Sequence, residues 1–326
     1  MTHQFMKRIL NIFLLLILSS CTSVKIAETP IVINTKVILT GTFLPPTPFP
    51  TITPTIEIPC DPFHAVYCIT DGHFILQRPI KPPANDLVDE TYLYGSTANG
   101  TREPHHGVEF PNQSGTPIYA AENGSVIFAG PDTEAIYSPW PNFYGNLVVL
   151  QHKDELFTLY AHLSKIDVKV GQVVGAGTKL GEVGRTGVAI GSHLHFEVRH
   201  GDVQYYFATQ NPELWLVPAK DANGNLFGTL MISVVDEDGK LVKYAEFTIR
   251  YSPEPSRKKV KSYYGITYSA DMLNGDTHSS PVDENAVLGE MPAGHYRIAI
   301  ERNGKVYERW VEVESEKLTQ VVFVVK

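Results

Sequence analysis

The chain has 326 residues, which is enough for two modest domains, and 43% of them are hydrophobic, so the chain can bury a substantial core. Its formal net charge is −8 at pH 7. A nucleic-acid-binding protein would carry a basic excess or a basic face, so this balance argues against that class. Any indication of function therefore has to come from particular segments of the chain.

The N-terminal segment has the pattern of a targeting sequence. Lys7 and Arg8 precede an apolar run from Ile9 to Leu18, which is too short to span a bilayer comfortably. The run leads into Leu18-Ser19-Ser20-Cys21, and small residues before a single cysteine resemble the lipobox of bacterial lipoproteins. This resemblance implies a signal peptide at residues 1–20, a lipid on Cys21 and an extracytoplasmic protein anchored to the cell membrane. The alternative is an ordinary signal peptide with an incidental cysteine.

Residues 21–59 are rich in threonine and proline, as in Pro45-Pro46-Thr47-Pro48. Proline at this density prevents a helix or a central strand. We therefore expect an extended tether that holds the folded part of the chain away from the membrane.

Cys60 and Cys68 are the only cysteines besides Cys21. Disulfides persist in exported proteins, and the short loop between the two residues could close easily, so the sequence predicts a disulfide. Metal binding is the alternative, but the pair lacks the Cys-x-x-Cys spacing and has no nearby partners.

The region from about Phe74 to Leu216 has the pattern of an antiparallel sheet. Short runs of β-forming residues, at 126–129, 147–150 and 157–160, are separated by glycine-containing turns. No long segment has the helical period of 3.6 residues. We predict an all-β domain at residues 60–218, with its core at about 100–202.

A second domain is predicted at residues 225–326. Turn signals recur there at short intervals, which is typical of a small β-sandwich. The stretch Gly289–Tyr296 resembles a late turn of carboxypeptidase-regulatory-like and related Ig-like modules. The strands we expect are 230–235, 245–251, 295–301, 306–313 and 319–325.

The first stretch with candidate chemistry reads Pro104-His105-His106-Gly107-Val108-Glu109-Phe110. On a strand, alternate side chains share a face, so His105, Gly107 and Glu109 would lie on one face and His106 on the other. A straight strand would separate the backbones of residues 105 and 109 by about 13 Å, so we expect a bend, which Gly107 can supply. His105 and Glu109 are therefore candidate ligands of one ion, and His106 is a bystander.

A second stretch is Tyr160-Ala161-His162-Leu163. His162 has the same parity as Thr158 and Tyr160, while the residues between them are apolar. This alternation predicts that His162 lies on the polar side of an edge or groove strand. Taken alone, it would more commonly be a surface histidine.

The third stretch is His193-Leu194-His195. On a strand, the two histidines share a face, with their backbones about 6.5–7 Å apart. Both imidazoles can reach one ion or its near surroundings. The spacing alone leaves open whether both bind metal or only one does.

Together these stretches resemble the lysostaphin/LytM-type zinc endopeptidases of peptidoglycan. The resemblance covers residues 105–199 and keeps the family's motifs in order. The matching motifs are His105-x-x-x-Glu109, Gly115–Val126, Tyr144–Val149, Leu159–Leu163, Val170–Gly177, Gly181–Gly187 and His193–Arg199.

The resemblance implies an antiparallel LytM-type peptidase fold, similar to a duplicated hybrid motif, with one zinc ion as cofactor. It implies that His105, Glu109 and His195 are the metal ligands and that His162 and His193 are the catalytic pair. Glu109 stands where the family usually has aspartate. Glutamate is an equally competent oxygen ligand, but the backbone must absorb its extra methylene.

The roles within the site have alternatives. We expect His193 to act as the base and His162 to stabilise the transition state, although the two roles could be exchanged. In a rival arrangement, His193 and His195 bind zinc with His105, and Glu109 is the general base. Arg185 and Ser192, in glycine-rich loops nearby, could contact substrate.

The implied function is hydrolysis of peptide cross-links in bacterial peptidoglycan outside the cytoplasm, with no nucleic-acid partner. One alternative is a catalytically silent relative that binds cell wall or regulates another wall hydrolase. Another is that residues 228–326 form the main functional unit and bind a glycan or a protein.

Overall fold

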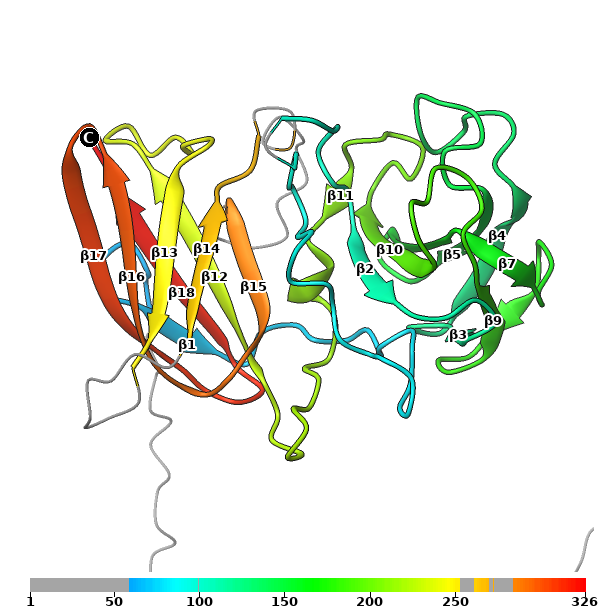
Figure 1. Ribbon diagram of the computed structural model, residues 1–326, viewed down its shortest axis with the longest axis horizontal. Helices are drawn as coiled ribbons and strands as arrows, with labels where there is room; N and C mark the ends of the chain where they lie inside the picture. The colour runs from blue at the N-terminus through cyan, green and yellow to red at the C-terminus, as the bar shows by residue number, and fades with distance from the viewer. Residues whose placement is uncertain (1–58, 99, 253–260, 270–271, 273–283) are drawn as a thin grey trace, which may run out of the picture. The chain divides into compact units, whose positions relative to one another are not determined.

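The computed structural model of the chain describes residues 59–98, 100–252, 261–269, 272 and 284–326. The described residues form strands and loops, with a single short 3₁₀ helix, η1 (Pro212–Leu214), which confirms the all-β prediction (Figure 1). In this part of the chain no helix has the length and apolar character of a membrane span. The predicted signal peptide, Cys21 and nearly all of the tether lie outside the described residues.

The larger of the sheets follows the order β11–β10–β6–β5–β4–β8, and β2 pairs with β10 on the same side as β11. All of these pairs are antiparallel. A three-stranded antiparallel sheet, β3–β9–β7, accompanies it. The bounds are β2 Val108–Pro111, β3 Pro117–Tyr119, β4 Gly124–Pro131, β5 Asn146–Gln151, β6 Leu156–Ala161, β7 Leu163–Ile166, β8 Val173–Val174, β9 Lys179–Val183, β10 His193–His200 and β11 Thr209–Gln210.

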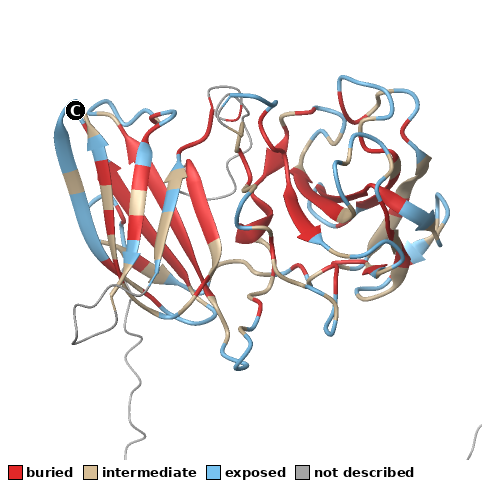
Figure 2. Cartoon of the chain, viewed as in Figure 1, coloured by how far each residue is buried: buried red, intermediate tan, exposed pale blue. Residues whose placement is uncertain are grey.

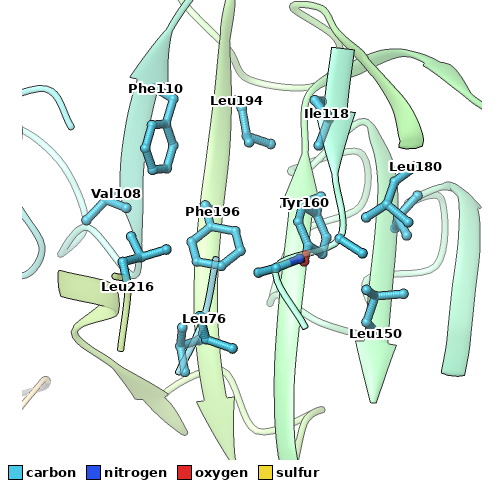
Figure 3. Close-up of a cluster of buried hydrophobic side chains, with 14 of the residues drawn as sticks. Leu76, Val108, Phe110, Ile118, Leu150, Tyr160, Leu180, Leu194, Phe196 and Leu216 are labelled. Atoms are coloured by element: carbon cyan, nitrogen blue, oxygen red, sulfur yellow. The ribbon is translucent and has the colours of Figure 1, made fainter. Parts of the chain in front are cut away.

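Strand β10 divides its side chains between a hydrophobic core and a polar face. Leu194, Phe196 and Val198 enter the main core cluster, where Phe196 lies between Val108 of β2 and Tyr160 of β6 (Figure 3). Alternation along the strand therefore sends the residues between them to the opposite face. That face carries His193, His195, Glu197 and Arg199.

The C-terminal region is a β-sandwich, as predicted. Its two four-stranded sheets have the orders β1–β18–β12–β15 and β14–β13–β16–β17, and a hydrophobic cluster fills the space between them. Strands β12 and β18 pair in parallel, and the other pairs in this region are antiparallel. The bounds are β1 Cys68–Thr70, β12 Gly228–Val235, β13 Glu246–Tyr251, β14 Ser262–Ile266, β15 Ala286–Met291, β16 Gly294–Arg302, β17 Lys305–Val313 and β18 Leu318–Val324.

The start of the described chain belongs to this sandwich. Strand β1 pairs with β18, so residues 68–70 extend a sheet of the C-terminal region rather than the sheet that carries the histidines. The predicted disulfide between Cys60 and Cys68 is present. The domain boundaries at 60–218 and 225–326 stay predictions, because residues 57–326 form one compact unit.

Strand β12 shows why the two regions form one unit. All of its residues are buried (Figure 2). Leu230, Ile232 and Val234 enter the interior of the sandwich, whereas Met231 and Val235 point to the opposite face. There they join a cluster that contains residues from the other region, namely Leu214, Trp215 and Phe74. A sandwich sheet with both faces buried is attached through packing, not only through the connecting chain.

Candidate functional site

The register of β2 against β10 brings a carboxylate beside two imidazoles. Glu109 lies opposite His195, and Pro111 lies opposite His193. His193 and His195 share a face, as predicted from their spacing, because they are two residues apart on β10. Glu109 can therefore reach both rings.

His105 reaches the same place from outside the strand. Its predicted position on a strand is wrong, because β2 begins only at Val108. The expected bend is present at Gly107. A Cβ atom at Gly107 would lie 2.4 Å from the carbonyl oxygen of Phe196 and 3.0 Å from Cε1 of His195. Glycine therefore allows the chain to turn directly against β10 and to direct His105 back toward Glu109.

Three donor atoms from these residues converge in a buried position. Oε1 of Glu109 lies 2.9 Å from Nε2 of His105 and 3.0 Å from Nδ1 of His195, and the two nitrogens are 3.3 Å apart. In a tetrahedral zinc site with bonds of about 2.0–2.1 Å, ligand atoms lie roughly 3.3–3.4 Å from one another. The observed triangle is only slightly smaller than this, so these residues could hold a metal ion.

The charges of this cluster stabilise one another. Burial opposes the charged form of His195, but Glu109 and Glu197 outweigh burial and raise the pKa of His195 to about 10. Burial also opposes the charged form of Glu109 and would by itself raise its pKa. The imidazoles around the carboxylate, above all His195, instead hold that pKa well below its usual range. A bound cation would supply the positive charge that the proton on His195 supplies here.

A second buried carboxylate lies behind His195. Nε2 of His195 donates to Oε1 of Glu197 at 3.0 Å, which leaves Nδ1 as the atom available to a metal. Arg199 donates to Oε2 of Glu197 through Nε at 2.9 Å and Nη2 at 2.7 Å. Tyr144 donates its hydroxyl to Oε1 of Glu197 and accepts from Nη2 of Arg199. Glu197 and Arg199 are fully buried, and their charges compensate each other.

Glu197, Arg199 and Tyr144 were not predicted as site residues from the sequence. A signal exists for the first two, because His195, Glu197 and Arg199 alternate with apolar residues along one strand. When ionisable residues occupy every second position of a strand and apolar residues occupy the positions between them, the ionisable side chains share one face. This pattern indicates a polar network on that face. No pattern in the sequence connects Tyr144 with them.

The remaining two histidines lie beside this cluster. The ring centroid of His162 is 4.9 Å from that of His193 and 5.7 Å from that of His195. Nε2 of His193 lies 2.9 Å from Oε2 of Glu109, and its Nδ1 donates to the carbonyl of Gly191 at 3.0 Å. Nδ1 of His162 donates to the carbonyl of Thr186 at 2.8 Å.

The predicted place of His162 on a polar strand face is wrong. Thr158 and Tyr160 are fully buried, and Tyr160 belongs to the main core cluster, so their face of β6 is not polar. Strand β6 ends at Ala161, and His162 has a φ of 64°, in the left-handed region. This turn of the backbone, and not strand parity, directs the ring to the side of His193. Burial, followed by the charges of His195 and His193, lowers the pKa of His162 to about 3, so this ring is neutral at pH 7.

Three other residues named from the sequence differ in their environments. His106 is buried and stacks on Tyr206 at 3.8 Å between ring centroids, apart from the three converging donor atoms. Arg185 is exposed, and the hydroxyl of Ser192 is buried. Contact of Arg185 or Ser192 with substrate stays a prediction.

Replacing Arg199 by methionine would leave the charge of Glu197 buried without its main partner. We expect the free energy of unfolding, measured by urea denaturation of the metal-free protein, to fall by about 3–5 kcal/mol. The double variant Glu197→Gln/Arg199→Met removes both charges and should lose less. As a control, Arg185→Met at an exposed arginine should change stability by no more than about 0.5 kcal/mol. Equal losses at the two arginines would contradict the buried network.

Replacing Gly107 by alanine tests the bend that directs His105. The added Cβ would force β2 and β10 apart, so we expect about 1–3 kcal/mol of destabilisation together with weaker binding of zinc. Gly130→Ala is the matched control, because a Cβ there meets no atom within 4 Å. Both variants can be compared by thermal unfolding and by zinc titration. Unchanged zinc affinity in Gly107→Ala would contradict the role assigned to the bend.

Comparison with known proteins gives a family match for the part of the chain that contains these residues. Residues 103–206 match the family model described as Peptidase family M23. Over 95 residues the chain is 41% identical to the peptidoglycan DD-endopeptidase ShyA of Vibrio cholerae, a match that covers 29% of this chain and 20% of ShyA. Over 105 residues it is 36% identical to the uncharacterized lipoprotein YgeR of Escherichia coli, covering 32% of this chain and 37% of YgeR.

A zinc-containing peptidase from Vibrio cholerae is among the similar solved structures, with 31% identity over 40% of this chain and 39% of that one and a TM-score of 0.33. The chain spans about a fifth of the length of ShyA and well under half of that of YgeR. The stretch that matches the M23 family model, residues 103–206, contains His105, Glu109, His162, His193 and His195.

Proposed function

We propose that this protein is a zinc-dependent endopeptidase that hydrolyses peptide cross-links of bacterial peptidoglycan. The observation that carries the proposal is the buried triangle of His105 Nε2, Glu109 Oε1 and His195 Nδ1, with two further imidazoles beside it. The M23 match and the relative named as a peptidoglycan DD-endopeptidase support the substrate class. Zinc bound by these three residues would polarise the scissile carbonyl and lower the pKa of a water molecule.

The geometry favours this ligand set over the rival one. Glu109 directs Oε1 toward His105 and His195 and directs Oε2 toward His193. His193 therefore contacts the carboxylate without joining the triangle. Three protein ligands leave an open coordination position, as a catalytic zinc site requires.

The hydrogen bonds of the other two histidines suggest how they divide the proton transfers. Nδ1 of His162 is occupied by the carbonyl of Thr186, so the neutral ring offers Nε2 as a proton acceptor. Each nitrogen of His193 faces an oxygen acceptor, on Gly191 and Glu109, so this ring is suited to donate a proton. We propose that His162 accepts the proton of the attacking water and that His193 stabilises the developing oxyanion, the reverse of the first expectation.

The N-terminal segment supports an extracytoplasmic location. We propose cleavage after residue 20, a lipid anchor on Cys21 and a tether to residue 59, which would let the enzyme reach the wall from the membrane. YgeR, a relative named as a lipoprotein, supports the anchor. The residues from 225 to 326 are proposed to form an Ig-like module.

The activity can be tested by mass spectrometry of muropeptides released from purified peptidoglycan, together with the zinc content of the protein. We expect one zinc ion per chain and release of cleaved cross-links by the wild-type protein. Chelation should abolish release, and added zinc should restore it. Protein that binds no zinc and releases no muropeptides would contradict the proposal and favour a silent, wall-binding relative.

His162→Ala and His193→Ala separate the catalytic pair from the ligands. Each substitution removes a proton-transfer group but leaves the triangle intact, so we expect a loss of at least about 100-fold in activity with zinc still bound. His195→Ala should lose both zinc and activity. Loss of zinc in His193→Ala would contradict the division between ligands and catalytic pair.

A further inference from the structure

The segment 89–96 holds His105 from several sides. Nδ1 of His105 donates to the carbonyl of Tyr92 at 3.0 Å and approaches that of Leu93 at 3.3 Å. The ring of Tyr92 stacks on that of His105, with 4.0 Å between centroids and 17° between planes. The backbone of His105 also pairs with Gly95 and Ser96, at 2.7 and 2.9 Å. This segment therefore sets both the position of His105 and which ring nitrogen faces Glu109.

The same segment supports the neighbouring strand. The amide of Asp89 donates to the carbonyl of Glu109 at 2.9 Å. Two of the three residues in the triangle, His105 and Glu109, thus depend on segment 89–96 for backbone hydrogen bonds. Outer contacts of this kind orient metal ligands, and losing them typically costs 10–100-fold in metal affinity or activity.

The opposite side of the segment contacts residues of the C-terminal sandwich. Tyr268, which follows β14, packs edge-to-face against Tyr94 at 5.2 Å. A Cβ on Gly95 would lie 2.5 Å from Cδ1 of Tyr268, so the ring of Tyr268 rests directly on the backbone of the segment. Lys261 bonds Glu90 at 3.0 Å.

Tyr268 is well anchored for such a role. It belongs to the main core cluster, although it is part of the C-terminal region. Its hydroxyl accepts from Nδ2 of Asn211 at 2.9 Å, and its amide donates to the carbonyl of Asn285 at 2.9 Å. The sandwich is further attached by the partly buried ion pair of Glu290 and Arg78.

Glu290 also reaches the start of the segment. Its Oε1 accepts from the amide of Val88 at 3.0 Å, one residue before Asp89. Segment 89–96 is thus bounded by contacts with the sandwich at its beginning, through Glu290, and near its end, through Tyr268.

We propose that the C-terminal sandwich is a positioning part of the metal site and that Tyr268 is its main positioning residue. Tyr268 presses on Tyr94 and Gly95, which holds segment 89–96 against His105. Without this contact, the carbonyls of Tyr92 and Leu93 would no longer fix the ring. The sandwich thereby contributes to metal affinity. The inference rests on the proposed function, since it assumes that His105 binds zinc.

The test compares zinc affinity, measured with a competing chelator, across variants of the full-length protein. We expect Tyr268→Ala to lose about tenfold in affinity. Tyr268→Phe retains the ring and should remain within about twofold of the wild type. Tyr296→Ala is the matched control for lost stability, because Tyr296 is fully buried in the sandwich core, in a different hydrophobic cluster from Tyr94 and Tyr268. It should leave zinc affinity unchanged at temperatures where the protein is folded.

A second pair of variants tests the contact if Tyr268→Ala does not fold. Gly95 and Gly100 have similar positive φ values, 75° and 77°, so alanine is strained at both. Only at Gly95 would the added Cβ meet the ring of Tyr268, because at Gly100 it meets no atom within 4 Å. Gly95→Ala should therefore weaken zinc binding about tenfold relative to Gly100→Ala.

The outcomes distinguish the inference from the proposed function. Wild-type protein that binds no zinc would overturn the proposed function, and the inference with it. If the wild type binds zinc, equal affinities in Tyr268→Ala and Tyr296→Ala, or in the two glycine variants when Tyr268→Ala does not fold, would overturn the inference alone.

Discussion

The antiparallel register of β2 against β10 is the constraint on which the site depends. It sets Glu109 opposite His195, and the bend at Gly107 then returns His105 to the same point. A slip of one residue would turn Glu109 toward the hydrophobic core and Phe110 toward the histidines. Because Val108 and Phe110 are fully buried, the core itself opposes such a slip. Hydrophobic packing on one face of the sheet thereby determines the arrangement of the polar groups on the other.

The polar face carries an energetic cost that the structure offsets locally. Buried carboxylates and a buried guanidinium are tolerated because each finds charged or hydrogen-bonding partners. Glu197 is shared between His195, Arg199 and Tyr144, and Glu109 is shared between three imidazoles. The network fixes the orientation of His195 while keeping Nδ1 available. The same residues therefore contribute to both the stability of the fold and the binding of metal.

Much of this arrangement could be predicted from the sequence, and the exceptions have physical reasons. Alternation and turn residues predict strands such as β5, β6, β12 and β17, and they place His193 and His195 on one face. Alternation fails for His162, because a left-handed backbone turn at that residue ends the strand and redirects the ring. Alternation also fails for β14 and β15, because buried and exposed residues do not alternate regularly along these strands. The contact of Tyr268 with segment 89–96 joins residues more than a hundred positions apart, and no local pattern encodes it.

A crystal structure of the zinc-loaded protein tests the central claim most directly. The account predicts one ion bonded to Nε2 of His105, an oxygen of Glu109 and Nδ1 of His195, at distances of about 2.0–2.2 Å. It also predicts that His162 and His193 lie close to the ion without binding it. An ion held by His193 in place of Glu109, or no ion at this position after loading with zinc, would contradict the account.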